Sequence, residues 1–188
     1  MTLVIVLVII GVLALMAGVM YNSLIRLKFR TDEAWSDIAV QLKRRYDLIP
    51  NLVNSVKGYA SHEKTVFENI TKARSQALSA QTVGEAAKAD NQFQTALKSL
   101  FAVAEAYPTL RASENFQQLS TELTDTEDKI QASRRFYNGS ARDLNIRIQS
   151  FPTNILARMM GFKLREFFEV NASEQAAVAD PVKVDFSK

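Results

Sequence analysis

The hydrophobic positions of this chain divide into an unbroken block at the N-terminus and a periodic pattern over the rest. Residues 3–20 are all apolar or small, and no charged side chain occurs before Arg26. At about 1.5 Å per residue, a helix over residues 2–22 can cross a hydrocarbon core of about 30 Å. A core helix in a domain this small usually keeps a polar face, which this block lacks. The block therefore predicts a transmembrane anchor, assigned to residues 1–25.

A cleaved signal peptide is the alternative interpretation of this block. Such a peptide begins with a positively charged region, but only Met1 and Thr2 precede the apolar run. The run is also longer than the usual apolar core of a signal peptide, which has about 7–15 residues. Both features favour a retained anchor.

Basic residues follow the apolar block, and none precedes it. They are Arg26, Lys28, Arg30, Lys43, Arg44 and Arg45. Basic flanks of a membrane span stay on the cytoplasmic side. The asymmetry predicts a single-pass protein whose N-terminus is outside and whose main domain is cytoplasmic.

From Trp35 onward, apolar residues recur at steps of three and four, as on an amphipathic helix. They are Trp35, Ile38, Leu42, Tyr46, Ile49, Val53, Val56, Ala60, Phe67, Ile70, Ala73 and Ala77. Pro50 removes one backbone donor inside this stripe, so we expect a kink or a restart there. Gly58 and Ser61 mark a second weak point, where one helix can end and Ser61 can cap the next. Either one long broken helix or two helices fit the pattern.

Two further helices are expected. The first covers residues 82–106 and ends before Tyr107-Pro108, because the residue before proline avoids the helical region. The second follows a stripe from Phe116 to Ile148, about 36 residues in all, and ends at Phe151-Pro152. Short connections imply antiparallel neighbours. The predicted fold is all-α: a transmembrane helix, then an antiparallel up-and-down bundle of three long or four shorter helices over residues 26–152.

Residues 153–170 form a basic and hydrophobic segment that is rich in Met and Phe. Its candidate contact residues are Arg158, Met159, Met160, Phe162, Lys163, Arg165, Phe167 and Phe168. Such a segment can lie in the bilayer interface or bind a neighbouring subunit. Alternatively, it covers one end of the bundle. Residues 171–188 are polar and Ala-rich before a strand-like alternation, and we expect an extended tail.

Composition excludes several kinds of chemistry. Hydrophobic residues make up 47% of the chain, with 6 Gly and 4 Pro, which favours a helical fold. The chain has no Cys and a single His, so disulfides, thiolate nucleophiles and two-imidazole sites within one chain are impossible. His62-Glu63 lacks the second histidine of a zinc-protease motif. We predict no catalytic, cofactor-binding or metal-binding residue. A net charge of +3 is too small to indicate nucleic-acid binding.

Five polar residues interrupt or flank the apolar stripes: Asp47, Glu127, Arg134, Asn138 and Asn145. The last four share one helical face. They can form a polar groove that binds a ligand or the backbone of a partner. They can also be buried, hydrogen-bonded groups that fix the register between helices, as a core Asn does in coiled coils. We favour the second interpretation.

Many short blocks in this chain match the pattern of a known family. They are Tyr21-Asn22-Ser23-Leu24, Trp35, Gln41-Leu42, Arg45-Tyr46-Asp47-Leu48-Ile49-Pro50-Asn51-Leu52-Val53, Val56-Lys57-Gly58-Tyr59-Ala60, His62-Glu63, Ala73-Arg74, Tyr107-Pro108, Glu114-Asn115-Phe116, Glu122-Leu123, Thr126-Glu127, Ile130, Arg134-Arg135-Phe136-Tyr137-Asn138, Asn145 and Ser150-Phe151-Pro152. On these blocks the chain resembles the LemA family. The resemblance implies a bacterial membrane protein with one N-terminal span and a four-helix cytoplasmic bundle, and it favours the break near Gly58. It implies no catalytic residue.

These observations predict a non-enzymatic interaction or scaffold protein anchored in the bacterial cytoplasmic membrane. The expected partners are the lipid bilayer, further copies of the chain as a homo-oligomer, and other membrane proteins or peptides, without nucleic acid. The alternative function is a binding module for an exported or processed peptide, with the polar groove as its site.

Overall fold

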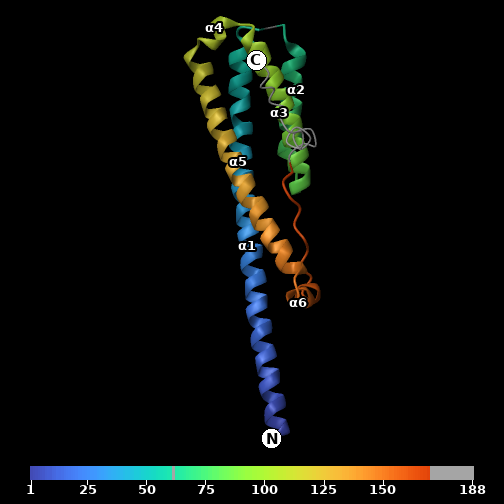
Figure 1. Ribbon diagram of the computed structural model, residues 1–188. Coiled ribbons are helices and arrows are strands. Elements are labelled where there is room, and N and C mark those ends of the chain that lie inside the picture. Colours follow the sequence, from blue (N-terminus) through green and yellow to red (C-terminus); the bar gives the residue numbers. More distant parts are fainter. Residues whose placement is uncertain (61, 170–188) are drawn as a thin grey trace, which may run out of the picture. The chain divides into compact units, whose positions relative to one another are not determined.

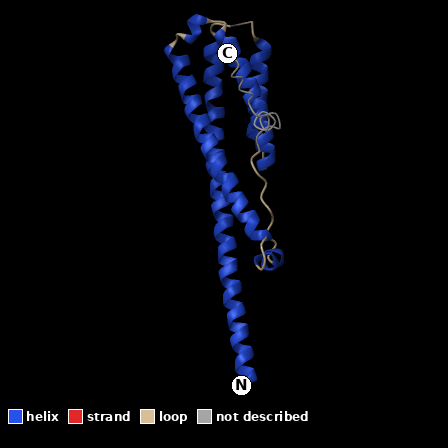
Figure 2. Cartoon of the chain, viewed as in Figure 1, coloured by secondary structure: helices blue, strands red, loops and turns tan. Residues whose placement is uncertain are grey.

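The computed structural model describes residues 1–60 and 62–169, and nearly all of them are helical (Figures 1 and 2). The helices are α1 (Thr2–Lys57), α2 (Lys64–Ser79), α3 (Val83–Glu105), α4 (Pro108–Arg111), α5 (Glu114–Gln149) and α6 (Thr153–Met159). The described residues contain no strand, so the predicted all-α class is confirmed. The predicted tail over residues 171–188 lies outside the described residues.

Helix α1 is one continuous helix from the apolar block to Lys57. It passes through Pro50, so the chain does not restart there, and it ends just before Gly58, where a break was expected. Its apolar window has a mean hydropathy of 3.1, and none of that window is buried. Among the described residues, α1 is the one helix long and apolar enough to cross a membrane.

Helices α2 and α3 form a helical hairpin with a short connection. Glu63 occupies the N-cap position of α2 and makes no side-chain cap hydrogen bond, and the predicted cap residue Ser61 lies outside the described residues. Thr82 caps α3: its side-chain oxygen accepts from the Glu85 backbone N–H at 3.1 Å, and Glu85 accepts from the Thr82 N–H at 3.2 Å. The backbone N–H groups of Gln81 and Thr82 lower the pKa of Glu85, because they stabilise the carboxylate.

Helix α5 has 36 residues, as its apolar stripe predicted. The single-turn helix α4 begins at Pro108, a residue suited to the first turn of a helix. The short helix α6 ends at a Schellman motif: the N–H of Phe162 bonds to the Ala157 carbonyl at 3.0 Å, and Gly161 has a φ of 72°. Beyond Gly161 the described chain, residues 162–169, has no helix or strand and runs as an extended trace (Figure 1).

The chain divides into two compact units, and α1 and α5 contribute to both. The anchor unit comprises Met1–Arg44 and Asp125–Phe167. Its core includes Leu24, Leu144, Ile148 and Ala157, with Leu27 and Phe162 packed against them. The described residues of the hairpin unit are Arg45–Thr124, without Ser61, together with Phe168 and Glu169. In the hairpin unit, segments of α1, α2, α3 and α5 follow one another up and down (Figure 1).

Candidate functional site

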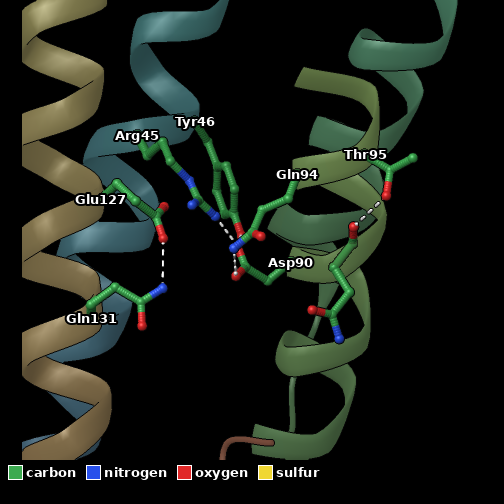
Figure 3. Close-up of polar contacts among 8 residues, drawn as sticks. Arg45, Tyr46, Asp90, Gln94, Thr95, Glu127 and Gln131 are labelled. Atoms are coloured by element: carbon green, nitrogen blue, oxygen red, sulfur yellow. Dashed lines mark hydrogen bonds and ion pairs between the residues drawn. The ribbon is translucent and has the colours of Figure 1, made fainter. Parts of the chain in front are cut away.

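The most buried polar cluster of the hairpin unit is centred on Asp90 (Figure 3). Arg45 forms an ion pair with Asp90, and both side chains are only 1% exposed. Gln94 donates its Nε2–H to Asp90 Oδ2 at 3.2 Å, and the Tyr46 hydroxyl donates to Asp90 Oδ1 at 3.5 Å. The carboxylate therefore has a cation and two neutral donors in place of water, which offsets the cost of burying it.

Aromatic rings enclose the guanidinium of this cluster. The Arg45 Cζ atom lies 4.9 Å from the Phe93 ring centroid and 5.6 Å from that of Tyr46. The two rings meet edge to face, with centroids 4.9 Å apart. Aromatic faces attract a cation, so the two rings stabilise the buried guanidinium. The cluster thus joins the C-terminal part of α1 to α3.

Arg74 explains why α1 continues through Pro50. Proline lacks the N–H that would bond to the carbonyl four residues earlier, and in this helix that carbonyl belongs to Tyr46. The Nε–H of Arg74 donates to the Tyr46 carbonyl oxygen at 2.7 Å. The same guanidinium lies 3.8 Å from Asp47, one of the predicted groove residues. A side chain from α2 therefore supplies the donor that proline removes from α1.

Sequence reasoning did not single out Asp90, and Arg45 entered it only as a basic flank and a family residue. The position of Asp90 in the sequence nevertheless indicated that it is buried. Asp90 lies three residues before Phe93 and seven before Leu97, so a carboxylate occupies the apolar stripe of α3. A charge on such a stripe indicates a buried partner, although the partner's identity needs the tertiary structure.

In the anchor unit, α5 binds an extended segment of its own chain. We name residues 162–167, which follow α6, the strap. The Asn145 amide donates to the Arg165 carbonyl at 2.9 Å and accepts from the Arg165 N–H at 2.8 Å. The Tyr137 hydroxyl donates to the Glu166 carbonyl at 2.8 Å. Two side chains on α5 thus satisfy three backbone groups that an extended segment would otherwise leave to water.

An ion pair and an aromatic contact support the strap. Arg165 pairs with Asp32 on α1, where both side chains are partly exposed. The Tyr137 ring packs on Trp35 with centroids 5.8 Å apart. Burial raises the pKa of Tyr137, because desolvation disfavours the phenolate. Tyr137 therefore stays neutral and remains a hydrogen-bond donor.

The predicted groove residues are divided between the units. Asp47 belongs to the hairpin unit, and the other four lie on the part of α5 in the anchor unit. Glu127 accepts a hydrogen bond of 2.7 Å from Gln131, one turn along the same helix (Figure 3). Arg134 is buried and Asn138 is half-buried. Asn145 does bind a backbone segment, but the segment belongs to its own chain.

The predicted contact residues around α6 differ in exposure. Met159 is 79% exposed and Met160 is 53% exposed, and Arg158 and Lys163 also face solvent. Phe162 packs on the core of the anchor unit, and Phe168 is buried. Arg165 is engaged with Asp32. The segment therefore contributes to the fold of the anchor unit and also carries an exposed apolar surface.

An open groove of about 730 Å³ runs along α2 in the hairpin unit. Lys57, Lys64 and Lys72 line it; Lys57 lies over the Phe67 ring, and Lys64 pairs with Glu68 at 3.7 Å. All three lysines are exposed to solvent, and we assign no ligand to them. Within residues 1–60 and 62–169, no three His, Asp or Glu side chains are grouped to hold a metal ion.

Comparison with known proteins identifies the family of this chain. Magnetosome protein MamQ 2 of Paramagnetospirillum magneticum is 28% identical, over 86% of this chain and 69% of the relative. Magnetosome protein MamQ of Magnetospirillum gryphiswaldense is 26% identical over the same shares. Protein LemA of Metamycoplasma hominis is 31% identical, over 84% of this chain and 72% of the relative. The sequence model of the LemA family matches residues 34–186, and the chain belongs to the LemA family.

Proposed function

We propose that this protein is a non-enzymatic, membrane-anchored interaction protein that self-associates in the bacterial cytoplasmic membrane. Helix α1 is the observation that carries the proposal. No residue of its apolar start is buried, and the same helix continues without a loop into the core of the helical domain. A hydrocarbon environment would cover the exposed start, and the unbroken helix would hold the domain at the membrane surface.

The family and the polar clusters support this proposal. The chain belongs to the LemA family, whose name denotes no reaction, and the MamQ relatives are named as magnetosome proteins. The polar clusters around Asp90 and Asn145 are engaged in holding helices and the strap together. A structural use of these groups suits a scaffold better than a catalyst. The relatives are bacterial, and the basic residues after the apolar block favour a cytoplasmic domain.

Small residues in the apolar block support self-association. Gly11, Ala14 and Gly18 are spaced by three and four residues and share one face of α1. A Cβ atom added at Gly11 or Gly18 would meet no other atom. In membranes, such faces let two helices approach closely. Exposed aromatic rings outside the block are a second feature that supports self-association: Phe29 and Phe136 of the anchor unit are 65% and 46% exposed.

The mass of the full-length protein in mild detergent tests self-association. We expect a particle of more than one chain, measured by light scattering with correction for detergent. The double variant Gly11→Leu, Gly18→Leu should reduce the mass, because bulk on this face separates the helices. Ile9→Phe with Met16→Phe adds bulk to the opposite face and serves as the control. A strictly monomeric wild-type particle would contradict the proposed self-association.

The proposed topology has its own test. A thiol introduced by Thr2→Cys is unique, because the chain contains no Cys. It should react with a membrane-impermeant reagent in intact spheroplasts. Reaction only after permeabilisation would reverse the orientation. The intact mass of the mature protein separates an anchor from a signal peptide, since cleavage would remove the apolar block.

A second candidate function is a binding module for an extended peptide. Asn145 and Tyr137 favour it, because they bind main-chain groups, which every peptide offers. The test is the fluorescence anisotropy of a labelled peptide with the sequence of residues 162–169, titrated with the full-length protein. Saturable binding that Asn145→Leu abolishes would support the module. Equal peptide binding by the wild type and by Asn145→Leu would count against the module, and so would the absence of peptide binding by the wild type.

A further inference from the structure

One face of α6 and of the turn before it is apolar and exposed. Phe151, Ile155 and Met159 follow one another at four-residue steps and are 81%, 56% and 79% exposed. Residues at this spacing lie on the same side of a helix. Thr153 and Ala157, on the opposite side, are buried. The helix is thus amphipathic, but its larger apolar side chains face away from the protein.

Contacts within the anchor unit place α6 beside the end of the apolar block. Ala157 belongs to the same core cluster as Leu24, which follows the last spanning residue by two positions. The Phe162 ring meets the Tyr21 ring edge to face, with centroids 6.5 Å apart. The two positions from the end of the span to Leu24 correspond to about 3 Å along the helix axis. If residues 2–22 span the bilayer, α6 therefore lies at the depth of the lipid headgroups.

The orientation of α6 is held by several bonds. The Schellman motif at Gly161 turns the chain into the strap, and Asn145 binds the strap through both backbone groups of Arg165. The core cluster holds the inner side of α6. The exposed face is consequently fixed in its direction and does not turn inward to cover itself.

The charges near this face suit an anionic surface. Arg158 and Lys163 are exposed beside it, and Arg26 and Lys28 follow the apolar block on α1. Basic residues next to an apolar face attract anionic lipid headgroups, while the apolar side chains enter the boundary with the acyl chains. Tyr21 is a residue type enriched at that boundary.

We propose that the α6 face formed by Phe151, Ile155 and Met159 inserts into the headgroup and acyl boundary of the membrane. Arg158 and Lys163 contact anionic lipid phosphates beside it. The protein then has a second membrane contact, about one helix diameter from the span, which fixes the tilt and rotation of the domain on the membrane. This inference rests on the proposed anchoring by residues 2–22.

Depth measurement on the full-length protein tests this proposal. Single cysteines are introduced as Ile155→Cys or Met159→Cys, spin-labelled, and reconstituted in vesicles of three parts phosphatidylcholine to one part phosphatidylglycerol. Ile9→Cys reports the anchor. Val40→Cys, an apolar position on α1 that is 59% exposed, is the matched aqueous control. Accessibility is compared between oxygen, which concentrates in lipid, and a water-soluble nickel chelate.

We expect labels at 155 and 159 to be more accessible to oxygen than the label at 40, at a depth shallower than the label at 9. Equal nickel accessibility at 159 and 40, with a lipid-buried label at 9, would overturn the second contact and leave the anchor standing. A label at 9 that lies in water would contradict both the proposed anchor and the second membrane contact. Labels at 155 and 159 that are shielded from both reagents and broadened by a neighbouring label would assign the face to a second copy and overturn the lipid assignment.

The basic residues have a separate arm in the same experiment. Arg158→Ala with Lys163→Ala should reduce the depth of the label at 159 in vesicles with phosphatidylglycerol. In vesicles of phosphatidylcholine alone, the double variant should match the parent. An equal loss of depth in both vesicles would contradict the role of anionic headgroups.

Discussion

The two units of this protein use buried and half-buried polar groups in different ways. In the hairpin unit, Asp90 is bound by side chains: a guanidinium, a phenol and an amide. In the anchor unit, Asn145 and Tyr137 bind the main chain of the strap. The first arrangement depends on the identity of every partner. The second depends only on an extended backbone at the right distance.

This difference has consequences for stability. Removing one member of a buried ion pair leaves the other charge without compensation, at a cost of about 3–5 kcal/mol. A side chain that releases a strap exposes main-chain groups to water, which then solvates them, so the loss is smaller and local. Variants of the hairpin unit should therefore lower global stability, while variants at the strap should loosen one segment.

The largest effect is expected at the ion pair. Asp90→Ala should lower the free energy of unfolding by about 3–5 kcal/mol, because Arg45 stays buried without its carboxylate. Chemical denaturation followed by circular dichroism measures this loss. Asp128→Ala, which removes an exposed carboxylate, is the control and should change little. A loss at Asp90 no larger than that of the control would erase the contrast between the units.

The next effect concerns the proline in α1. Arg74→Ala should cost about 1–3 kcal/mol, because it removes the hydrogen bond that Arg74 donates to the Tyr46 carbonyl. In a Pro50→Ala background the helix supplies its own N–H to that carbonyl, so the same substitution should cost less. A double-mutant cycle measures the coupling. Additive losses would show that Arg74 acts independently of the proline.

A local effect is expected at the strap. Asn145→Ala should accelerate amide hydrogen exchange at Arg165, by about tenfold for each 1.4 kcal/mol of lost local stability. Exchange in the core of the hairpin unit should remain as in the wild type. Gln149→Ala, at an exposed position of α5, is the control. Faster exchange throughout the protein would mean that the strap supports the whole fold.

The smallest effect is expected at Tyr137. Tyr137→Phe should cost about 1 kcal/mol, since one hydrogen bond to the strap is lost. Burial raises the pKa of Tyr137 above its ordinary value of 10.0, so the unfolded chain ionises first. The stability that the raised pKa of Tyr137 contributes to the free energy of unfolding is full below pH 10.0. It declines as the pH rises through the pKa of Tyr137 in the folded protein. The wild type should lose part of its advantage over Tyr137→Phe in that range, and a constant difference would contradict the raised pKa.

Periodicity was sufficient to predict helices, but not their polar partners. The stripes placed α3 and α5 with only small errors at their ends, because an apolar face that must be buried leaves a regular spacing. The continuity of α1 was not predictable from Pro50, because the replacement donor lies 28 residues from Tyr46. Likewise, Asn145 was recognised as a polar interruption, but its partner is a backbone 20 residues away, and a backbone has no sequence signature.

The number of copies in the native membrane tests the central claim most directly. Membrane patches containing the full-length protein can be extracted in lipid nanodiscs without detergent and weighed by native mass spectrometry. The proposed anchored scaffold predicts particles with two or more copies, and fewer copies per particle for Gly11→Leu with Gly18→Leu. Single copies at every expression level, including the native one, would contradict self-association.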